Sequence, residues 1–360
     1  MIKNFTLSLV ALAMVLAALV TAQPVAAETT LQCSDHTLNV TLAPGAIDTY
    51  QVVGTLCSQG PVAGKTVQLL LHGITYARYY WDLPYQNEHY SYVLSATKRG
   101  YVTFNLDRIG NGASDHPANS FLVDLYSNAF VVHQVVEALR AGQVGSTSFE
   151  KVIVVGHSMG SMTSINYAGS YPGEADGIIL TGFLHSINWD FAYASLIPNL
   201  YPALLDPKFT GQFTDPYYMT TKPDTRGVFY YLPNTDPQVV ALDESLKQTV
   251  TYAEFLTGPD VVYDQSSLQI TGPVQMVIGQ YDYLFCGPEV NLNCSDQVSV
   301  QDYEETKFST SACLETAVIN DAGHDLNLHL NAKATYSQML FWADRHVGST
   351  ADPAPEPCEP

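Results

Sequence analysis

One serine in this sequence has neighbours that suit it to chemistry. Ser158 lies in the segment GHSMG (residues 156–160), after the apolar run 152–155 and before a helix-like run over 161–169. A strand that turns directly into a helix needs small residues two positions to either side of the turn. Such a turn holds its central side chain above the sheet edge, at a helix N-terminus. The pattern therefore predicts that Ser158 is a nucleophile on a strand-to-helix turn.

A serine hydroxyl becomes a good nucleophile only beside a base, and the base needs an orienting partner. In a parallel α/β sheet these partners come from loops at the carboxyl ends of the strands. Asp282 follows the apolar run 274–278, and His324 follows the run 316–319. We expect His324 to be the base and Asp282 its partner. Asp321 and Asp325 are nearer to His324 in sequence, but residues of one tight loop seldom orient an imidazole.

A developing oxyanion needs hydrogen-bond donors. The backbone N–H of Met159, just after the nucleophile, is one candidate, and the loop after the first long strand supplies the other. In that loop, LLLHGI (residues 69–74), Gly73 permits a sharp turn and the N–H of Ile74 is the expected donor. His72 and His157 are interpreted as structural residues that brace these two loops.

Aromatic residues follow the oxyanion loop and recur in a later segment. They suit a cleft for apolar or aryl groups, although each could equally pack that segment onto the core. No basic cluster lies near the site in sequence, so a phosphorylated substrate is not indicated. The substrate-contacting residues we predict are Tyr76, Tyr80, Trp81 and Trp189.

The strands and helices that must position the candidate catalytic residues follow a repeating pattern in the sequence. Continuous apolar strands that alternate with helices indicate a mostly parallel sheet covered on both faces. No dinucleotide-type glycine fingerprint follows a strand. The expected strands are 67–71, 101–106, 152–155, 177–180, 274–278 and 316–319, and the expected helices are 90–99, 119–141, 161–169 and 331–345.

The pattern is interrupted once. Residues 187–268 are rich in Pro, Tyr and Phe and contain no comparable strand, and the pattern resumes after them. An insertion of this kind indicates a cap over one sheet within a single α/β domain, rather than two consecutive domains. We assign the domain to residues 65–348, a β-rich segment to 28–64 and a Pro-rich acidic tail to 349–360.

The N-terminus resembles a secretory signal. Residues 1–27 contain Lys3, a long apolar run and then small residues, with cleavage expected after Ala27 or, as an alternative, Ala22. The six cysteines agree with an oxidising compartment. We expect Cys33 to pair with Cys57. The other four allow three pairings, of which Cys286–Cys294 with Cys313–Cys358 is favoured.

Composition excludes several classes of protein. A hydrophobic content of 46% indicates a packed globule. A formal net charge of −20, with only 15 basic residues, would repel nucleic acid. No stretch after residue 27 is long and apolar enough to span a membrane.

The motifs together resemble the α/β-hydrolase superfamily in its capped, lipase- or esterase-like form. They occur in the family's order across about residues 65–346: LLLHGI (69–74), LDRIGNGASD (106–115), VVGHSMGS (154–161), GQYDYLF (279–285) and DAGHD (321–325). The resemblance implies an α/β-hydrolase fold with a Ser158–His324–Asp282 triad, an oxyanion hole at Ile74 and Met159, and no cofactor or metal. The Cys-bearing insertion 286–313 departs from the family pattern and affects the expected pocket rim.

The resemblance implies a secreted enzyme that hydrolyses a small-molecule or lipid-like ester. Haloalkane dehalogenases and epoxide hydrolases of this fold use an aspartate in place of the serine, so they fit less well. Lactonases, serine peptidases, cofactor-free haloperoxidases and carbon–carbon bond hydrolases remain alternatives, as does a non-catalytic scaffold. A peptidase would use an acidic residue such as Asp190 or Glu254 to bind a substrate terminus.

Overall fold

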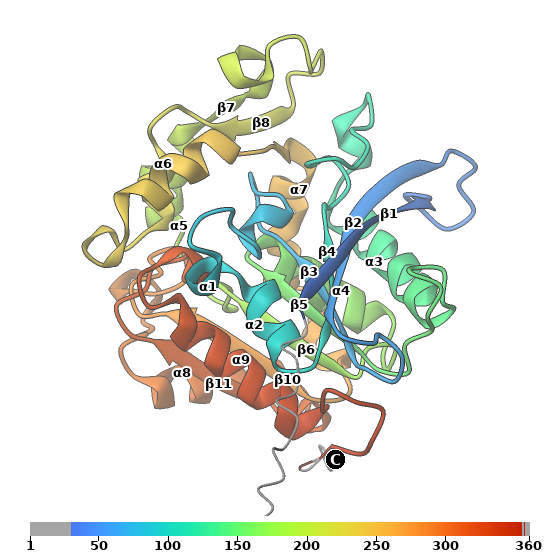
Figure 1. Ribbon diagram of the computed structural model, residues 1–360. Helices are drawn as coiled ribbons and strands as arrows, with labels where there is room; N and C mark the ends of the chain where they lie inside the picture. The colour runs from blue at the N-terminus through green and yellow to red at the C-terminus, as the bar shows by residue number, and fades with distance from the viewer. Residues whose placement is uncertain (1–29, 355, 357–360) are drawn as a thin grey trace, which may run out of the picture.

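The computed structural model describes residues 30–354 and 356. Its centre is an eight-stranded sheet in the order β1-β2-β4-β3-β5-β6-β10-β11 (Figure 1). The six strands from β4 to β11 in this order are parallel, and β1 and β2 are antiparallel at one edge. The strands are β1 (Leu31–Val40), β2 (Tyr50–Gln59), β3 (Val67–Leu71), β4 (Val102–Leu106), β5 (Val152–His157), β6 (Gly177–Thr181), β10 (Val274–Gly279) and β11 (Glu315–Ile319).

Helices cover both faces of this sheet, as predicted. In Figure 1, α2 and α9 lie in front of the strands and α4 lies behind them. α2 packs against α9, and α3 packs against α4. The central strands β3 to β6 are buried along their whole length, which explains their continuous apolar sequences. The helices outside the cap are α1 (Asn87–Tyr90), α2 (Tyr92–Lys98), α3 (Leu125–Arg140), α4 (Met159–Ser170), α8 (Gln297–Glu304) and α9 (Ala332–His346).

We call the chain between β6 and β10, residues 182–273, the cap segment. Its last part, residues 258–269, packs against α4. Figure 1 shows most of the cap segment above the carboxyl ends of the parallel strands. It is built from short helices and a three-stranded sheet of its own. Its main elements are α5 (Trp189–Phe191), β7 (Leu200–Pro202), β8 (Tyr218–Thr221), α6 (Pro237–Leu246), β9 (Val250–Thr251) and α7 (Tyr252–Thr257).

Two local predictions need correction. The helix expected over 119–141 begins only at Leu125, because Asp124 forms a capping box with Ser127 there. The helix expected over 90–99 is two helices, and Ser91 caps the second one. The N-terminal β-rich segment extends the main sheet, since β2 pairs with β4.

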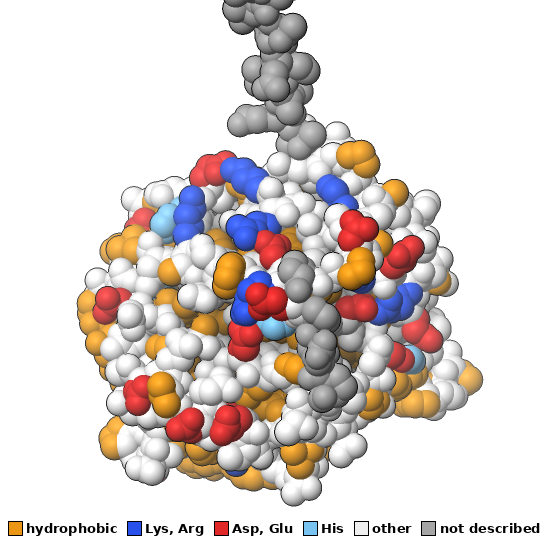
Figure 2. All heavy atoms as spheres, turned by 90° about the horizontal axis from the view of Figure 1, so that it is seen from below, with side chains coloured by type: hydrophobic (Ala, Val, Ile, Leu, Met, Phe, Trp, Pro, Cys, Tyr) orange, Lys and Arg blue, Asp and Glu red, His pale blue; other side chains and the backbone are white. Residues whose placement is uncertain are grey.

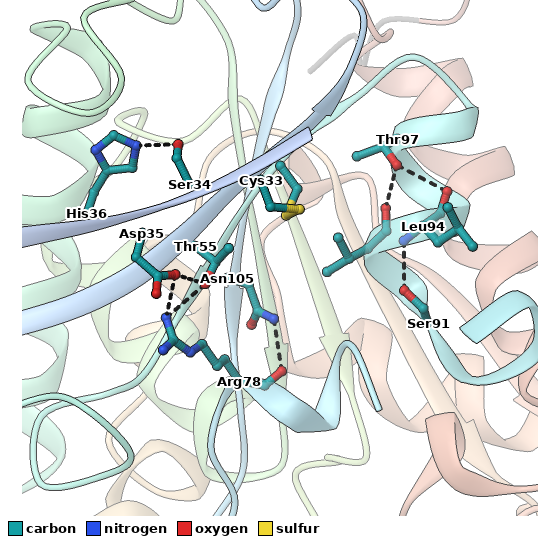
Figure 3. The surroundings of a disulfide bond; sticks show 12 residues. Cys33, Ser34, Asp35, His36, Thr55, Arg78, Ser91, Leu94, Thr97 and Asn105 are labelled. Carbon is teal, nitrogen blue, oxygen red and sulfur yellow. Dashed lines mark hydrogen bonds and ion pairs between the residues drawn. A yellow bond between two sulfur atoms is a disulfide. The ribbon is translucent and has the colours of Figure 1, made fainter. Parts of the chain in front are cut away.

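Two of the expected disulfides are present. Cys33 and Cys57 face each other across the β1–β2 pair, and Cys286 bonds to Cys294. Figure 3 shows Cys33 beside a polar cluster in which the Arg78 guanidinium donates to Asp35 Oδ1 at 3.1 Å. The expected partner of Cys313, Cys358, lies outside the described residues.

The signal segment 1–27 also lies outside the residues described. Within residues 30–354, no helix has both the length and the apolar character that a membrane crossing requires. Figure 2 shows the face opposite the cap segment, where Lys and Arg side chains lie among Asp and Glu side chains. Arg99 and Asp344, whose Nε and Oδ2 atoms are 2.5 Å apart, form a partly exposed ion pair.

Candidate active site

Ser158 occupies a strained turn between β5 and α4. Its backbone has φ 53° and ψ −117°, a conformation that residues with a side chain seldom adopt. The flanking glycines are required by close packing. A Cβ on Gly156 would lie 2.5 Å from the backbone of Gly160, and a Cβ on Gly160 would lie 2.3 Å from the carbonyl oxygen of Leu71. The sequence therefore folds here as its glycine spacing predicted.

His324 and Asp282 come from the loops after β11 and β10, which are adjacent parallel strands. The two loops are joined by a backbone hydrogen bond from Tyr281 to Ala322. His324 Nδ1 lies 2.9 Å from Asp282 Oδ2, and both side chains are buried. Burial lowers the pKa of His324, but the charge of Asp282 and its hydrogen bond outweigh this, so the pKa lies above its usual value of 6.5.

A pocket joins these residues to the cap segment. Its volume is about 70 Å³, and its polar lining residues are Ser158 and His324. The rest of the lining is apolar, and more than half of these apolar residues come from the cap segment, including Trp189. The apolar lining residues are Ile74, Met159, Met162, Ile187, Trp189, Ala192, Leu196, Phe229, Phe255, Pro259, Leu284 and Phe285.

The loop after β3 lies directly against Ser158. A Cβ on Gly73 would be 3.0 Å from the Cβ of Ser158. Ile74 and Met159 line the pocket beside Ser158, and Met159 is the first residue of α4, where a backbone N–H has no intrahelical acceptor. Thr75 has a positive φ of 55°, and its N–H donates to Thr249 of the cap segment at 3.0 Å. The cap segment thus fixes the path of this loop.

The other three aromatic residues predicted to contact substrate do not line the pocket. Tyr76, Tyr80 and Trp81 are all buried behind the loop. Tyr80 stacks on the ring of His157 with 4.0 Å between centroids, and Trp81 packs edge-on against Tyr80. Their spacing in sequence gave no indication that the loop turns these rings toward the core, so this part of the prediction is corrected.

Both further histidines near the site are structural, which agrees with their interpretation from sequence. His72 Nε2 accepts a hydrogen bond from the backbone N–H of Arg108 at 3.0 Å. Burial, and then the charge of Arg108, hold the pKa of His72 well below its usual value. His157 is fully buried, and burial followed by the charges of His324 and His72 lowers its pKa in the same way. Both imidazoles are therefore neutral near pH 7.

Sequence reasoning missed two buried ion pairs where the cap segment meets the core. Arg108–Glu254 spans the two, whereas Arg226–Asp243 lies within the cap segment and contacts the core loop. Arg226 donates to both carboxylate oxygens of Asp243, at 2.8 and 2.9 Å, and to the hydroxyl of Thr75. Arg108 pairs with Glu254, and its Nε donates to the carbonyl oxygen of His72 at 2.9 Å. Glu254 is paired with Arg108 and fully buried, so it is unsuited to bind a peptide terminus.

Among the described residues, one buried cluster combines metal-ligand side chains. His157, His324 and Asp325 bring one potential ligand atom each within 4.8 Å of the others. All three take part in protein hydrogen bonds, and His324 is also the partner of Asp282. The cluster is therefore accounted for by contacts within the protein.

The sequence matches a known family. Residues 68–337 match the model of the alpha/beta hydrolase family, so the chain belongs to that family. No curated protein sequence is significantly similar to it.

Solved structures with the same fold include several hydrolases. An esterase from Thermogutta terrifontis has 14% identity and a TM-score of 0.54, with 85% of this chain and 97% of that chain covered. E-2-(acetamidomethylene)succinate hydrolase has 16% identity and a TM-score of 0.54, with 86% and 100% covered. An esterase from Exiguobacterium antarcticum has 15% identity and a TM-score of 0.53, with 82% and 96% covered. At these identities the likeness concerns the fold.

Proposed function

We propose that this protein is a secreted serine hydrolase that cleaves carboxylic esters with small apolar or aryl acyl groups. The observation that carries the proposal is the combination of Ser158 on a strained turn and the His324–Asp282 pair in one apolar pocket. Membership of the alpha/beta hydrolase family supports hydrolysis as the reaction.

In the proposed reaction, His324 Nε2 accepts the proton of Ser158 Oγ as that oxygen attacks the ester carbonyl carbon. The backbone N–H groups of Ile74 and Met159 stabilise the oxyanion. His324 then gives its proton to the departing alcohol, which leaves an acyl-enzyme on Ser158. Water, deprotonated by His324, releases the acid and restores the serine. No step uses a cofactor.

Pocket size and lining support the substrate class. A volume of about 70 Å³ is far below the roughly 300–1,000 Å³ typical of small-molecule sites. The pocket as it stands suits a short acyl group, and a long acyl chain requires displacement of the cap segment. The lining contains no Asp, Glu, Lys or Arg side chain, and its polar residues are Ser158 and His324, which favours esters over peptides with a charged terminus.

The test is intact-mass measurement after treatment with a fluorophosphonate that carries a small alkyl group. Wild type should gain one adduct and Ser158→Ala none. An unlabelled wild-type protein with a cooperative thermal transition would contradict the proposal and favour a non-catalytic scaffold.

A substrate panel then separates the reaction types. Acetyl and butyryl aryl esters should turn over at least tenfold faster than decanoyl esters. Peptide amides should be inert, and their cleavage at comparable rates would replace the esterase assignment by a peptidase.

Secretion is supported by the signal-like residues 1–27 and by the two disulfides, which are typical of oxidising compartments. N-terminal sequencing of protein from the culture medium should begin at Glu28, or at Gln23 for the alternative cleavage site. Protein confined to the cell with Met1 intact would contradict this.

A further inference from the structure

The chain neighbours of the two principal catalytic residues touch each other. His157 immediately precedes Ser158, and Asp325 immediately follows His324. The Nε2 atom of His157 lies 3.3 Å from Oδ1 of Asp325, and neither side chain has exposed surface. A single contact thus joins the nucleophile turn to the loop of the base.

The hydrogen bonds around His157 indicate that one proton lies between His157 Nε2 and Asp325 Oδ1. The Thr181 hydroxyl donates its only proton to the carbonyl oxygen of Gly156 at 3.0 Å, so it accepts from His157 Nδ1 at 3.2 Å. A neutral His157 therefore carries its proton on Nδ1 and presents a lone pair at Nε2. Asp325 Oδ1 must then be the donor, because an ionised carboxylate would place two lone pairs in contact.

The second oxygen of Asp325 connects to two further parts of the site. It accepts from the hydroxyl of Tyr76, which lies two residues after Ile74 in the oxyanion loop. Tyr76 also contacts Asp243 Oδ2 at 3.0 Å, and Asp243 is held by Arg226 of the cap segment. Asp325 is therefore the junction of the nucleophile turn, the histidine loop, the oxyanion loop and the cap segment.

We propose that Asp325, in its protonated form, is a positioning residue that donates to His157 and so holds His324 against Ser158. This inference rests on the proposed function and adds a fourth side chain to the machinery of that site. The hydrogen bond matters to this role, and the carboxylate charge does not.

The surroundings of Asp325 agree with a retained proton. Burial raises its pKa to about 7, the charge of Asp243 adds to this, and the charges of His324 and Arg226 oppose it. Ionised Asp325 would in turn raise the pKa of its neighbour His324. The titratable or charged groups that face it are His157 from β5, His324 from its own loop, Tyr76, Tyr79 and Tyr80 from the oxyanion loop, and Arg226, Tyr230 and Asp243 from the cap segment.

The experiment compares Asp325→Asn with Asp325→Ala in the full-length protein. Asparagine keeps a donor for His157 and an acceptor for Tyr76 without charge, whereas alanine removes both. At pH 6.5, fluorophosphonate labelling of Asp325→Asn should stay within about fivefold of wild type. Asp325→Ala should be slower by ~10²-fold, the usual effect of a misplacement near 1 Å. Asp321→Asn, an exposed change in the same loop, is the matched control.

A pH profile of labelling supplies the second readout. In wild type the rate should rise as His324 loses its proton and fall again as Asp325 ionises and ceases to be a donor, so two coupled ionisations are expected. In Asp325→Asn the amide remains a donor at every pH, so the rate should follow the ionisation of His324 alone and keep its plateau at high pH. A purely structural role would leave the same profile at high pH in both proteins, and this readout stands even if Asp325→Ala fails to fold.

Two outcomes would overturn the inference. One is an Asp325→Asn variant as slow as Asp325→Ala at every pH, which would mean that the charge is needed. The other is a folded Asp325→Ala variant that labels like wild type. Wild-type protein that does not label at all contradicts the proposed function instead, so the two failures are distinguishable.

Discussion

At the scale of single residues, the site combines strain with burial. The positive φ of Ser158 costs of the order of 1–3 kcal/mol and is maintained by the packing of β5 and α4 around it. His324 is as buried as the core, yet its charged form is favoured by Asp282. Both features are typical of residues whose geometry is needed for chemistry.

Replacement of Asp282, the proposed triad acid, tests the His324–Asp282 pair. Asp282→Asn keeps the shape of the side chain but favours the wrong imidazole tautomer, so kcat for a short-chain aryl ester should fall by about 10⁴. Steady-state kinetics at pH 7.5 measure this, with Asp321→Asn as the control that should match wild type. A loss of less than tenfold in Asp282→Asn would remove Asp282 from the triad.

The raised pKa of His324 predicts the pH dependence of activity. The imidazole must be neutral to accept the proton of Ser158, so the rate should first rise with pH, and the midpoint of this rising limb should lie above pH 6.5. A pH series of kcat/KM checks this. A half-maximal rate below pH 6 would contradict the dominance of Asp282 over burial.

At the scale of elements, the cap segment is anchored to the catalytic loops by buried charges rather than only by apolar contacts. Arg226–Asp243 holds Thr75 and Tyr76, and Arg108–Glu254 holds the backbone of His72. Loss of one partner in such a pair leaves an uncompensated buried charge, which is strongly destabilising.

The Arg108–Glu254 pair gives a stability prediction. Glu254→Gln keeps the capping-box geometry of α7 but leaves the Arg108 charge unpaired, so the free energy of unfolding should fall by about 3–5 kcal/mol. Chemical denaturation measures this. The exposed Lys98–Glu88 pair is the control, and Glu88→Gln should leave the transition midpoint unchanged. Equal midpoints for Glu254→Gln and wild type would show that the pair is dispensable.

Most helices and strands could be predicted from the sequence, because local sequence signals define them. Continuous apolar runs predicted the parallel strands, and the glycines around Ser158 predicted the turn. The loops that carry Asp282 and His324 followed from strand order alone. Contacts between the cap segment and the core could not be predicted, since Asp243 and Asp325 are distant in sequence and meet only through the fold. Tyr76 and Tyr80 were misassigned because the direction of a loop side chain has no periodic signature.

At the scale of the whole molecule, the N-terminal hairpin closes one edge of the sheet. The Cys33–Cys57 disulfide joins β1 to β2 over a sequence separation of 24 residues. Removal of such a disulfide lowers the free energy of unfolding by about 2–5 kcal/mol. The pair is remote from Ser158 in the sheet, because β2, β4 and β3 separate β1 from β5.

The double variant Cys33→Ala/Cys57→Ala should therefore lose stability without loss of chemistry. Its free energy of unfolding should fall by about 3 kcal/mol, while its fluorophosphonate labelling rate at 25 °C stays equal to that of wild type. The closer pair Cys286–Cys294, separated by 8 residues, should contribute less when it is replaced in the same way. A large drop in labelling for the Cys33/Cys57 variant would show that the hairpin shapes the site.

The entry and exit of the cap segment lie at opposite edges of the sheet, since it leaves the carboxyl end of β6 and returns to the amino end of β10, and these neighbouring strands are parallel. The cap segment is thus part of a strand-to-strand crossover, and an exchange of this stretch for a new specificity must keep the portion that returns along α4. The exchange has a fixed requirement. A replacement must bring its own counter-charge for Arg108 and a partner for Tyr76, or those core residues must be neutralised together with it.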